Sequence, residues 1–156
     1  MLEITIPGFA SLRLRHLVLD YNGTLAVDGQ LLPGVKERLA SLSRILQVHV
    51  LTADTFGLAR TTLADVPCEL SILAPEGQDL AKSAYVARLG AAEVVCIGNG
   101  RNDRRMLWSA AIGIAVMGRE GVAAAAASAS DLIVPSIVDA LDLLDNPLRL
   151  VASLRS

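Results

Sequence analysis

The sequence predicts a single α/β domain in three layers, with a mostly parallel sheet between two layers of helices. Short apolar runs alternate with helical patterns along the chain, which is typical of successive βαβ units. The apolar run from Leu17 to Leu19 stops at Asp20, as expected of a central strand that is buried on both faces. A length of 156 residues fits one domain, so we expect residues 1–156 to form one unit.

The first part of the chain predicts a hairpin, the central strand and a small flap. Residues 2–6 and 11–15 alternate apolar and polar side chains on either side of a Pro7-Gly8 turn. After the central strand, Asp28-Gly29 is a hairpin-turn signal within residues 26–35. We therefore expect a β-flap beside Asp20.

From residue 35 onward, the spacing of apolar residues predicts an alternation of helices and strands. Trp108, within one of these helices, is expected to pack on the sheet. Helices are expected over residues 35–46, 56–64, 78–89, 103–110, 122–129 and 137–144. Strands are expected over residues 47–51, 69–73, 93–97, 112–117 and 132–134.

The charge and composition of the chain bear on whether it binds nucleic acid or a membrane and on where it is located. The chain has 14 Lys and Arg against 16 Asp and Glu, and a net charge of −2 favours neither a nucleic-acid nor a membrane partner. No apolar stretch reaches the roughly 20 residues of a membrane span. The start of the sequence lacks the pattern of a signal peptide. Cys68 and Cys96 are expected to be reduced, which predicts a cytoplasmic location.

Polar residues follow three of the predicted strands. They are the segments Asp20 to Thr24, Thr52 to Asp54 and Gly98 to Asp103. Because parallel strands carry their carboxyl ends to one edge of the sheet, we expect these groups to converge there. Lys82, near the start of its helix, adds an ammonium. A carboxylate, a hydroxyl, an ammonium and loop amides are the groups that phosphoryl transfer requires.

Several of these residues also have a purely structural interpretation. Thr52 is compatible with a strand-end cap, and Lys82 with a solvated helix face. Asp54 is either a helix cap or a site residue. His16 and His49 are more typical of packing or surface roles than of catalysis.

Four segments in order resemble the motifs of the haloacid dehalogenase (HAD) superfamily. Residues 20–25, Asp-Tyr-Asn-Gly-Thr-Leu, resemble the first motif. Residues 51–54, Leu-Thr-Ala-Asp, resemble the second, in the form seen in P-type ATPases; Lys82 matches the third, and residues 98–103 resemble the fourth. The chain is most similar to small soluble P-type-ATPase-like members. The resemblance implies a HAD-type, Rossmann-like fold and a phosphatase or phosphoryl-transfer activity.

The resemblance assigns roles to individual residues. Asp20 would attack the phosphorus and form an aspartyl-phosphate, with Asn22, Thr52 and Lys82 as the other catalytic positions. Mg²⁺ would be held by the Asp20 side chain, the Asn22 backbone carbonyl, Asn99 and Asp103. The phosphate group would contact Asn22, Gly23, Thr52, Ala53, Lys82 and Asn102.

Two asparagines depart from the family pattern. Asn22 stands where phosphatases of the family carry the Asp that acts as general acid and base, and an amide cannot exchange a proton near neutral pH. Asn99 replaces a carboxylate at the metal. We therefore expect slow turnover and weak Mg²⁺ binding. The alternative is a catalytically weakened HAD-fold binding or regulatory module. A receiver-type phosphoacceptor fits less well, because no acidic pair ends the first strand.

The spacing of the motifs leaves no room for a cap domain. Only the flap and one helix fit between Asp20 and Thr52, and only one helix and one strand fit between Lys82 and Gly98. Such an open site either takes a bulky substrate or is covered by a neighbour, in a homo-oligomer whose partner covers residues 26–32. The candidate substrates are small phosphoesters, acyl phosphates and nucleotides.

Overall fold

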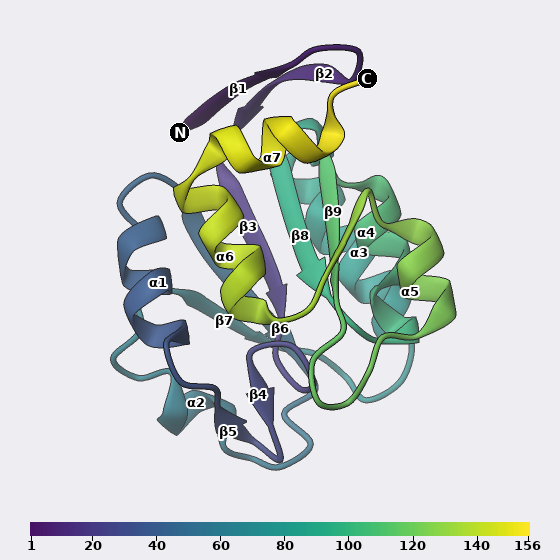
Figure 1. Cartoon of the computed structure of the whole chain (residues 1–156). Coiled ribbons are helices and arrows are strands. Elements are labelled where there is room, and N and C mark those ends of the chain that lie inside the picture. The colour runs from purple at the N-terminus through teal and green to yellow at the C-terminus, as the bar shows by residue number, and fades with distance from the viewer.

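A six-stranded parallel sheet forms the middle layer of the molecule (Figure 1). The computed structural model describes all residues, 1–156. The strand order is β10-β9-β8-β3-β6-β7, so β3 lies between β8 and β6, as predicted for the central strand. The strands are β3 (His16–Asp20), β6 (Gln47–Thr52), β7 (Glu69–Ile72), β8 (Val94–Gly98), β9 (Ile112–Val116) and β10 (Leu132–Val134).

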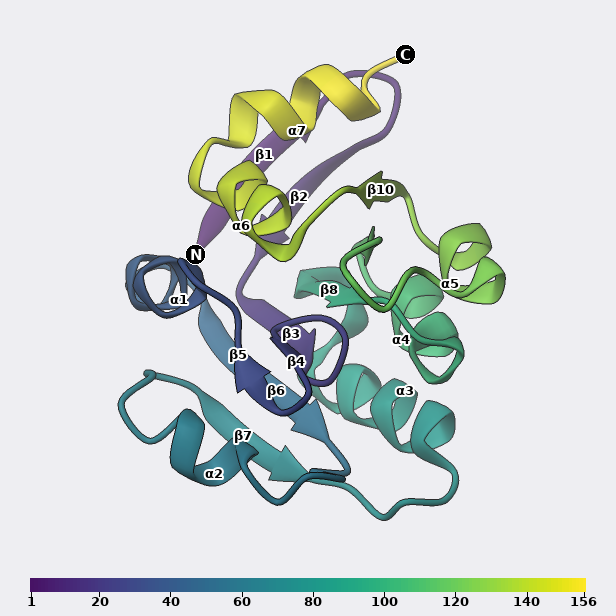
Figure 2. The same cartoon turned by 60° about the horizontal axis from the view of Figure 1, so that its bottom comes forward.

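Helices cover both faces of this sheet (Figure 2). Helices α1 and α6 pack on one face, and α3, α4 and α5 pack on the other. No helix has both the length and the apolar character that crossing a membrane requires. The helices are α1 (Val35–Leu42), α2 (Ala59–Thr62), α3 (Gln78–Leu89), α4 (Arg104–Ser109), α5 (Ala124–Ala129), α6 (Ile137–Asp145) and α7 (Pro147–Leu154), with 3-10 turns η1 (Ala91–Glu93) and η2 (Arg101–Asp103).

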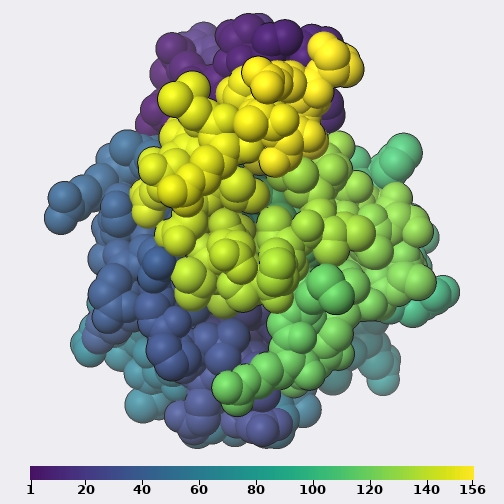
Figure 3. All heavy atoms as spheres, in the orientation of Figure 1, coloured from purple at the N-terminus to yellow at the C-terminus, as the bar shows by residue number.

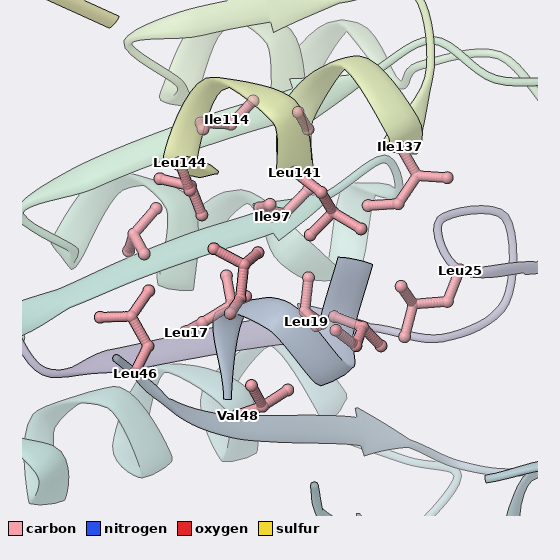
Figure 4. Close-up of a cluster of buried hydrophobic side chains, with 14 of the residues drawn as sticks. Leu17, Leu19, Leu25, Leu46, Val48, Ile97, Ile114, Ile137, Leu141 and Leu144 are labelled. Atoms are coloured by element: carbon pink, nitrogen blue, oxygen red, sulfur yellow. The ribbon is translucent and has the colours of Figure 1, made fainter. Parts of the chain in front are cut away.

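The core has two parts because successive residues of a strand point to opposite faces. In β3, Leu17 and Leu19 belong to the larger cluster with α1 and α6, whereas Val18 faces α3 and α4. Figure 4 shows Leu17 and Leu19 on the same side of the sheet as Leu141 of α6. The three side chains of β3 are fully buried, so this strand is fixed in place from both faces.

A hairpin of β1 (Leu2–Ile6) and β2 (Ala10–Leu14) extends beyond the sheet at its amino-terminal edge. Helix α7 packs against β1, and Figure 3 shows the C-terminal segment, in yellow, directly beneath the purple hairpin. The alternating pattern of apolar and polar residues predicted the hairpin. The sequence analysis did not predict helix α7.

The predicted flap lies at the opposite, carboxyl edge of the sheet. It consists of β4 (Ala26–Val27) and β5 (Gln30–Leu31), joined through Asp28 and Gly29 (Figure 2). The buried Tyr21, which directly follows β3, donates a hydrogen bond from its hydroxyl to the Gly29 carbonyl at 3.0 Å. This bond ties the tip of the flap to the end of the central strand.

Several predictions for the helical layers differ from the structure. The helix expected over residues 35–46 ends at Leu42. The helix expected over residues 56–64 is reduced to α2, because Gly57 has a positive φ of 67° and the chain before it forms an irregular loop. The expectation that Trp108 packs on the sheet is wrong, since its side chain is 77% exposed. Helix α4 is only 6 residues long and buries Met106 and Leu107, which leaves the next residue on its outer side.

Candidate active site

Asp20 lies at the carboxyl end of β3 and is held from two sides. Its Oδ1 accepts a hydrogen bond from Lys82 Nζ at 2.6 Å, and its Oδ2 accepts one from Thr24 Oγ1 at 3.1 Å. The residue is 6% exposed, so the carboxylate is nearly buried while its edge still reaches the pocket described below. A carboxylate fixed in this way has little rotational freedom left.

One ammonium joins the first and fourth motif segments. Lys82 of α3 is fully buried, and its Nζ donates to Asp20 Oδ1 at 2.6 Å and to Asp103 Oδ1 at 2.7 Å. The other oxygen of Asp103 accepts the backbone N–H groups of Asn99 at 3.0 Å and Gly100 at 2.8 Å. The structure thus brings together residues 20, 82 and 103, and Lys82 is not on a solvated face.

The charges of this trio influence one another strongly. Burial raises the pKa of Asp20, and the neighbouring Asp103 carboxylate raises it further, while Lys82 opposes both effects. Burial alone would lower the pKa of Lys82, but the two carboxylates outweigh it and the pKa is raised. A single ammonium cannot neutralise two ionised carboxylates, and the pKa of Asp20 is raised to about 7. A cation bound beside Asp20 would therefore favour its ionised form.

Thr52 and Asp54 lie at the end of the neighbouring strand β6. Thr52 is 2% exposed and lines the pocket, and its Oγ1 accepts the Asp54 N–H at 2.9 Å. Asp54 has a φ of 50°, and its Oδ1 accepts the Ala59 N–H at 2.9 Å. Asp54 therefore caps the start of α2, and Thr52 combines a strand-end cap with a place in the pocket.

The two unusual asparagines are placed differently. The Oδ1 atom of Asn22 is buried and has no hydrogen-bond partner. Asn99 donates from Nδ2 to the Gly121 carbonyl at 3.0 Å, and its Oδ1 lies 3.2 Å from Thr24 Oγ1. The Gly23 N–H, predicted as a phosphate contact, donates here to the Ala26 carbonyl at 2.7 Å.

A pocket of about 210 Å³ opens beside Asp20 at this edge of the sheet. Lys82 and Asp103 lie buried beneath it and do not line it. The predicted residues that line it are Asp20, Asn22, Thr52, Ala53, Asn99 and Asn102. The lining residues that the sequence analysis missed are Thr55, Gln78, Gly100 and Glu120.

Glu120 is the missed residue with the clearest sequence signal. Strand β9 also ends at this edge, and it is followed by Gly118, Arg119, Glu120 and Gly121. Counting the polar residues after this strand together with those of the other three would have placed Glu120 in the site.

The donor atoms of the pocket fit a hard divalent cation. Asp20, Asn22 and Asn99 line the pocket, and they carry a carboxylate and two amide oxygens, the type of donor that Mg²⁺ prefers over nitrogen or sulfur. The chain contains no group of three or more His, Cys, Asp or Glu side chains that could hold a metal ion. Mg²⁺ commonly keeps several waters and takes only one or two carboxylates from the protein, which fits the donors that line this pocket.

Two curated proteins of Methanocaldococcus jannaschii are similar to this chain in sequence. The uncharacterized protein MJ0073 is 46% identical over 63 residues, which is 40% of this chain and 68% of that protein. The uncharacterized protein MJ0072 is 49% identical over 39 residues, which is 25% of this chain and 89% of that protein. No family model matches the chain.

Solved structures of HAD phosphatases and of a P-type ATPase share this fold. A cobalt-bound deoxy-D-mannose-octulosonate 8-phosphate phosphatase from Haemophilus influenzae has a TM-score of 0.71 at 15% identity, over 92% of this chain and 94% of that one. The 3-deoxy-D-manno-octulosonate 8-phosphate phosphatase of Moraxella catarrhalis was solved with magnesium, phosphate and KDO. It has a TM-score of 0.70 at 14% identity, over 91% of this chain and 94% of that one. A zinc-transporting PIB-type ATPase has a TM-score of 0.59 at 21% identity, over 79% of this chain and 20% of that one. The chain therefore belongs to the same family as the two archaeal proteins and has the fold of the HAD superfamily.

Proposed function

We propose that this chain is a Mg²⁺-dependent phosphatase or phosphoryl transferase that acts through an aspartyl-phosphate on Asp20. The observation that carries the proposal is the placement of Asp20 at the end of the central strand, 2.6 Å from a buried ammonium that also binds Asp103. Phosphoryl transfer needs a positioned nucleophile and positive charge around the phosphoryl oxygens, and this trio together with a cation provides both.

Each residue of the chain has a defined part in the proposed reaction. An Asp20 carboxylate oxygen forms a bond to phosphorus while the bond from phosphorus to the leaving oxygen breaks. Lys82 and Thr24 hold the carboxylate in place through the bonds described above. Thr52 and Asn102 line the pocket where the phosphoryl oxygens would lie. Mg²⁺, when bound, would reduce the repulsion between the carboxylate and the phosphate.

The chain lacks a proton donor at position 22, so we expect the reaction to be slow. General acid–base assistance is worth roughly 10²- to 10⁴-fold in rate, and Asn22 cannot supply it. Substrates whose leaving group departs without a proton, such as acyl phosphates or aryl phosphates, should react best. The two solved phosphatases act on a phosphorylated sugar acid by name; by analogy, small phosphorylated metabolites and nucleotides are the first substrates to test.

The test is covalent labelling of Asp20 with Mg²⁺ present. We expect an acyl phosphate to label the wild type, and the label to resist acid and to be absent from Asp20→Asn. Beryllofluoride should form a stable adduct with the wild type alone. A panel of phosphorylated metabolites, run on the wild type and on Asp20→Asn, then identifies the substrate class.

A second candidate function is a binding or regulatory module that has kept the fold and lost efficient catalysis. Asn22, which lines the pocket, favours it, because its amide cannot transfer a proton from the position of the general acid. The variant Asn22→Asp separates the two candidates. If the chain is an enzyme limited at this step, the variant should turn over about 10²-fold faster. A protein that binds phosphate without reacting would gain no turnover.

A further inference from the structure

The loop after β9 brings a second carboxylate to the pocket. We propose that Glu120 is a ligand of the divalent cation, and that it supplies the negative charge that Asn99 lacks. The inference rests on the proposed function only in taking the same cation at the same pocket. It concerns a residue that lies outside the four motif segments.

The geometry places Glu120 directly over the first motif. Glu120 lines the pocket together with Asp20 and Asn99. A Cβ atom on Gly23 would overlap the Glu120 carboxylate and would lie 2.6 Å from Asn99 Nδ2 and 2.8 Å from Asn99 Oδ1. The Glu120 carboxylate and the Asn99 amide therefore both lie beside Gly23, in the space that a side chain at this position would occupy.

The loop that carries Glu120 is fastened on both sides. Its Gly121 carbonyl accepts the Asn99 Nδ2 at 3.0 Å, and the Ala123 N–H donates to the Asn99 carbonyl at 2.8 Å. At the other end, the Gly118 N–H donates to the Pro135 carbonyl at 3.1 Å. These bonds hold the loop beside the fourth motif. Glu120 itself forms no ion pair or hydrogen bond, so its carboxylate is free to bind a ligand.

The charge of the site favours a second carboxylate ligand. Asp20 and Glu120 are the two carboxylates among the residues that line the pocket. Asp103 is buried, and its oxygens already accept hydrogen bonds from Lys82 and from two backbone N–H groups. Mg²⁺ sites typically use one or two carboxylates, and Asn99 contributes a neutral amide. Glu120, which comes from the loop after β9, is positioned to be the second carboxylate ligand of the cation.

Direct metal binding without substrate tests this inference. Mg²⁺ affinity would be measured by calorimetry and Mn²⁺ affinity by electron paramagnetic resonance, on the wild type and on Glu120→Gln. Loss of a ligand should weaken binding of both ions about 10-fold or more, since even groups that only support a ligand are worth roughly 10- to 100-fold. The matched control is Glu76→Gln, which removes a charge from an exposed residue just before α3 and should leave the affinity unchanged.

A rescue experiment makes the test specific to the position. In Glu120→Gln, adding Asn99→Asp should restore most of the lost affinity, because the two side chains meet at the same point. Equal affinity in the wild type and Glu120→Gln, or no measurable Mn²⁺ binding by the wild type, would overturn the inference. Equal weakening in Glu76→Gln would also overturn it, since a general loss of charge would then explain the result.

The outcome is independent of the proposed function. Labelling of Asp20 at saturating Mn²⁺ reports on the reaction, whereas the binding measurements report on Glu120 alone. If Asp20 is labelled but Glu120→Gln binds the ion normally, this inference fails and the proposed function stands. If Glu120→Gln weakens binding but Asp20 is never labelled, the proposed function fails and Glu120 remains a ligand.

Discussion

Lys82 holds two carboxylates that would otherwise repel each other inside the protein. Both of its ion pairs are made where the ammonium is fully buried, and its partners come from residues 62 and 21 positions away in the sequence. Removing one partner of a buried ion pair is far more costly than the pair itself is stabilising, because the charge left behind loses its counter-ion. The residue is therefore structural, and in the proposed reaction it would also position Asp20.

We expect Lys82→Met to lower the free energy of unfolding by about 3–5 kcal/mol, measured by urea denaturation without metal. Adding Asp103→Asn to this variant should recover part of the loss, since one of the two repelling charges is then gone. The control is Lys36→Met. Its pair with Asp65 at 3.1 Å is largely exposed, and its loss should cost about 1 kcal/mol or less. Similar small losses in both variants would contradict this account.

A pair of histidines lies away from the pocket, between β3 and β6. His16 Nδ1 and His49 Nε2 are 3.1 Å apart, and His49 Nδ1 is 3.0 Å from the Tyr85 hydroxyl. Burial lowers the pKa of both histidines, with the nearby glutamates only partly compensating. The pair is a packing feature, as the sequence analysis favoured. In the neutral state one ring donates its proton and the other accepts it.

These histidines should make the protein less stable in acid. Because each folded-state pKa lies below the unfolded value of about 6.5, the unfolded chain takes up protons first as the pH falls. The stabilisation is complete above about pH 6.5 and is lost progressively as the pH falls toward the folded-state pKa values. Urea denaturation at about pH 7.5 and about pH 5.5 should show this loss. The double variant His16→Gln and His49→Gln should show a smaller change with pH, and an unchanged dependence would count against the pair.

At the scale of elements, α7 and the β1–β2 hairpin cover the amino-terminal edge of the sheet. Leu150 of α7 is fully buried in the larger core cluster, whereas Leu148 on the same helix is 84% exposed. Pro147 begins the helix, a position where its missing N–H leaves no hydrogen bond unmade. The helix is thus stabilised by one buried face and not by its length.

Leu150→Ala should lower the free energy of unfolding by about 2–5 kcal/mol, because it leaves a cavity between α7 and the core. Leu148→Ala, on the same helix, should change it by less than about 0.5 kcal/mol. Thermal and urea denaturation of the two variants would check the difference. If both variants behave alike, α7 is not packed as described.

The elements also show what the sequence could and could not predict. The ends of the strands and the position of α3 could be predicted from the sequence. Runs of apolar residues and the helical spacing of apolar residues are local patterns. The irregular loop before α2 was not, since it depends on Asp54 and Gly57 adopting positive φ angles. The burial of Lys82 and the approach of Glu120 to Gly23 depend on contacts between distant segments. No local sequence pattern predicts those contacts. They follow from the order of the strands in the sheet, which brings the distant segments together.

At the scale of the whole molecule, the pocket is open because no cap domain covers it. An apolar surface lies beside it, where Phe56 is 53% exposed and Leu58 is 36% exposed. Both residues pack on the flap, since a Cβ on Gly29 would lie 2.9 Å from Leu58 Cδ1 and 3.1 Å from Phe56 Cβ. This surface is where a neighbouring copy of the chain would reach the flap.

We therefore expect a homo-oligomer that buries the flap, and light scattering should show it at working concentration. Phe56→Arg should dissociate it, because a charge would be placed in the apolar contact. Trp108→Arg is the matched control, since Trp108 is also exposed but lies on α4, away from the flap. A monomeric wild type would rule out the oligomer, leaving an open site for a bulky substrate.

Both ends of the described chain lie on the side opposite the flap (Figure 1). The Ser156 N–H donates to the Pro7 carbonyl at 3.2 Å, and the Met1 amino group contacts the Ile45 carbonyl. An affinity tag, a fluorophore or a linker to a sensor chip at either end would therefore point away from the pocket. Immobilised molecules would present the mouth of the pocket to the bulk solvent, which makes ligand screening on a surface practical.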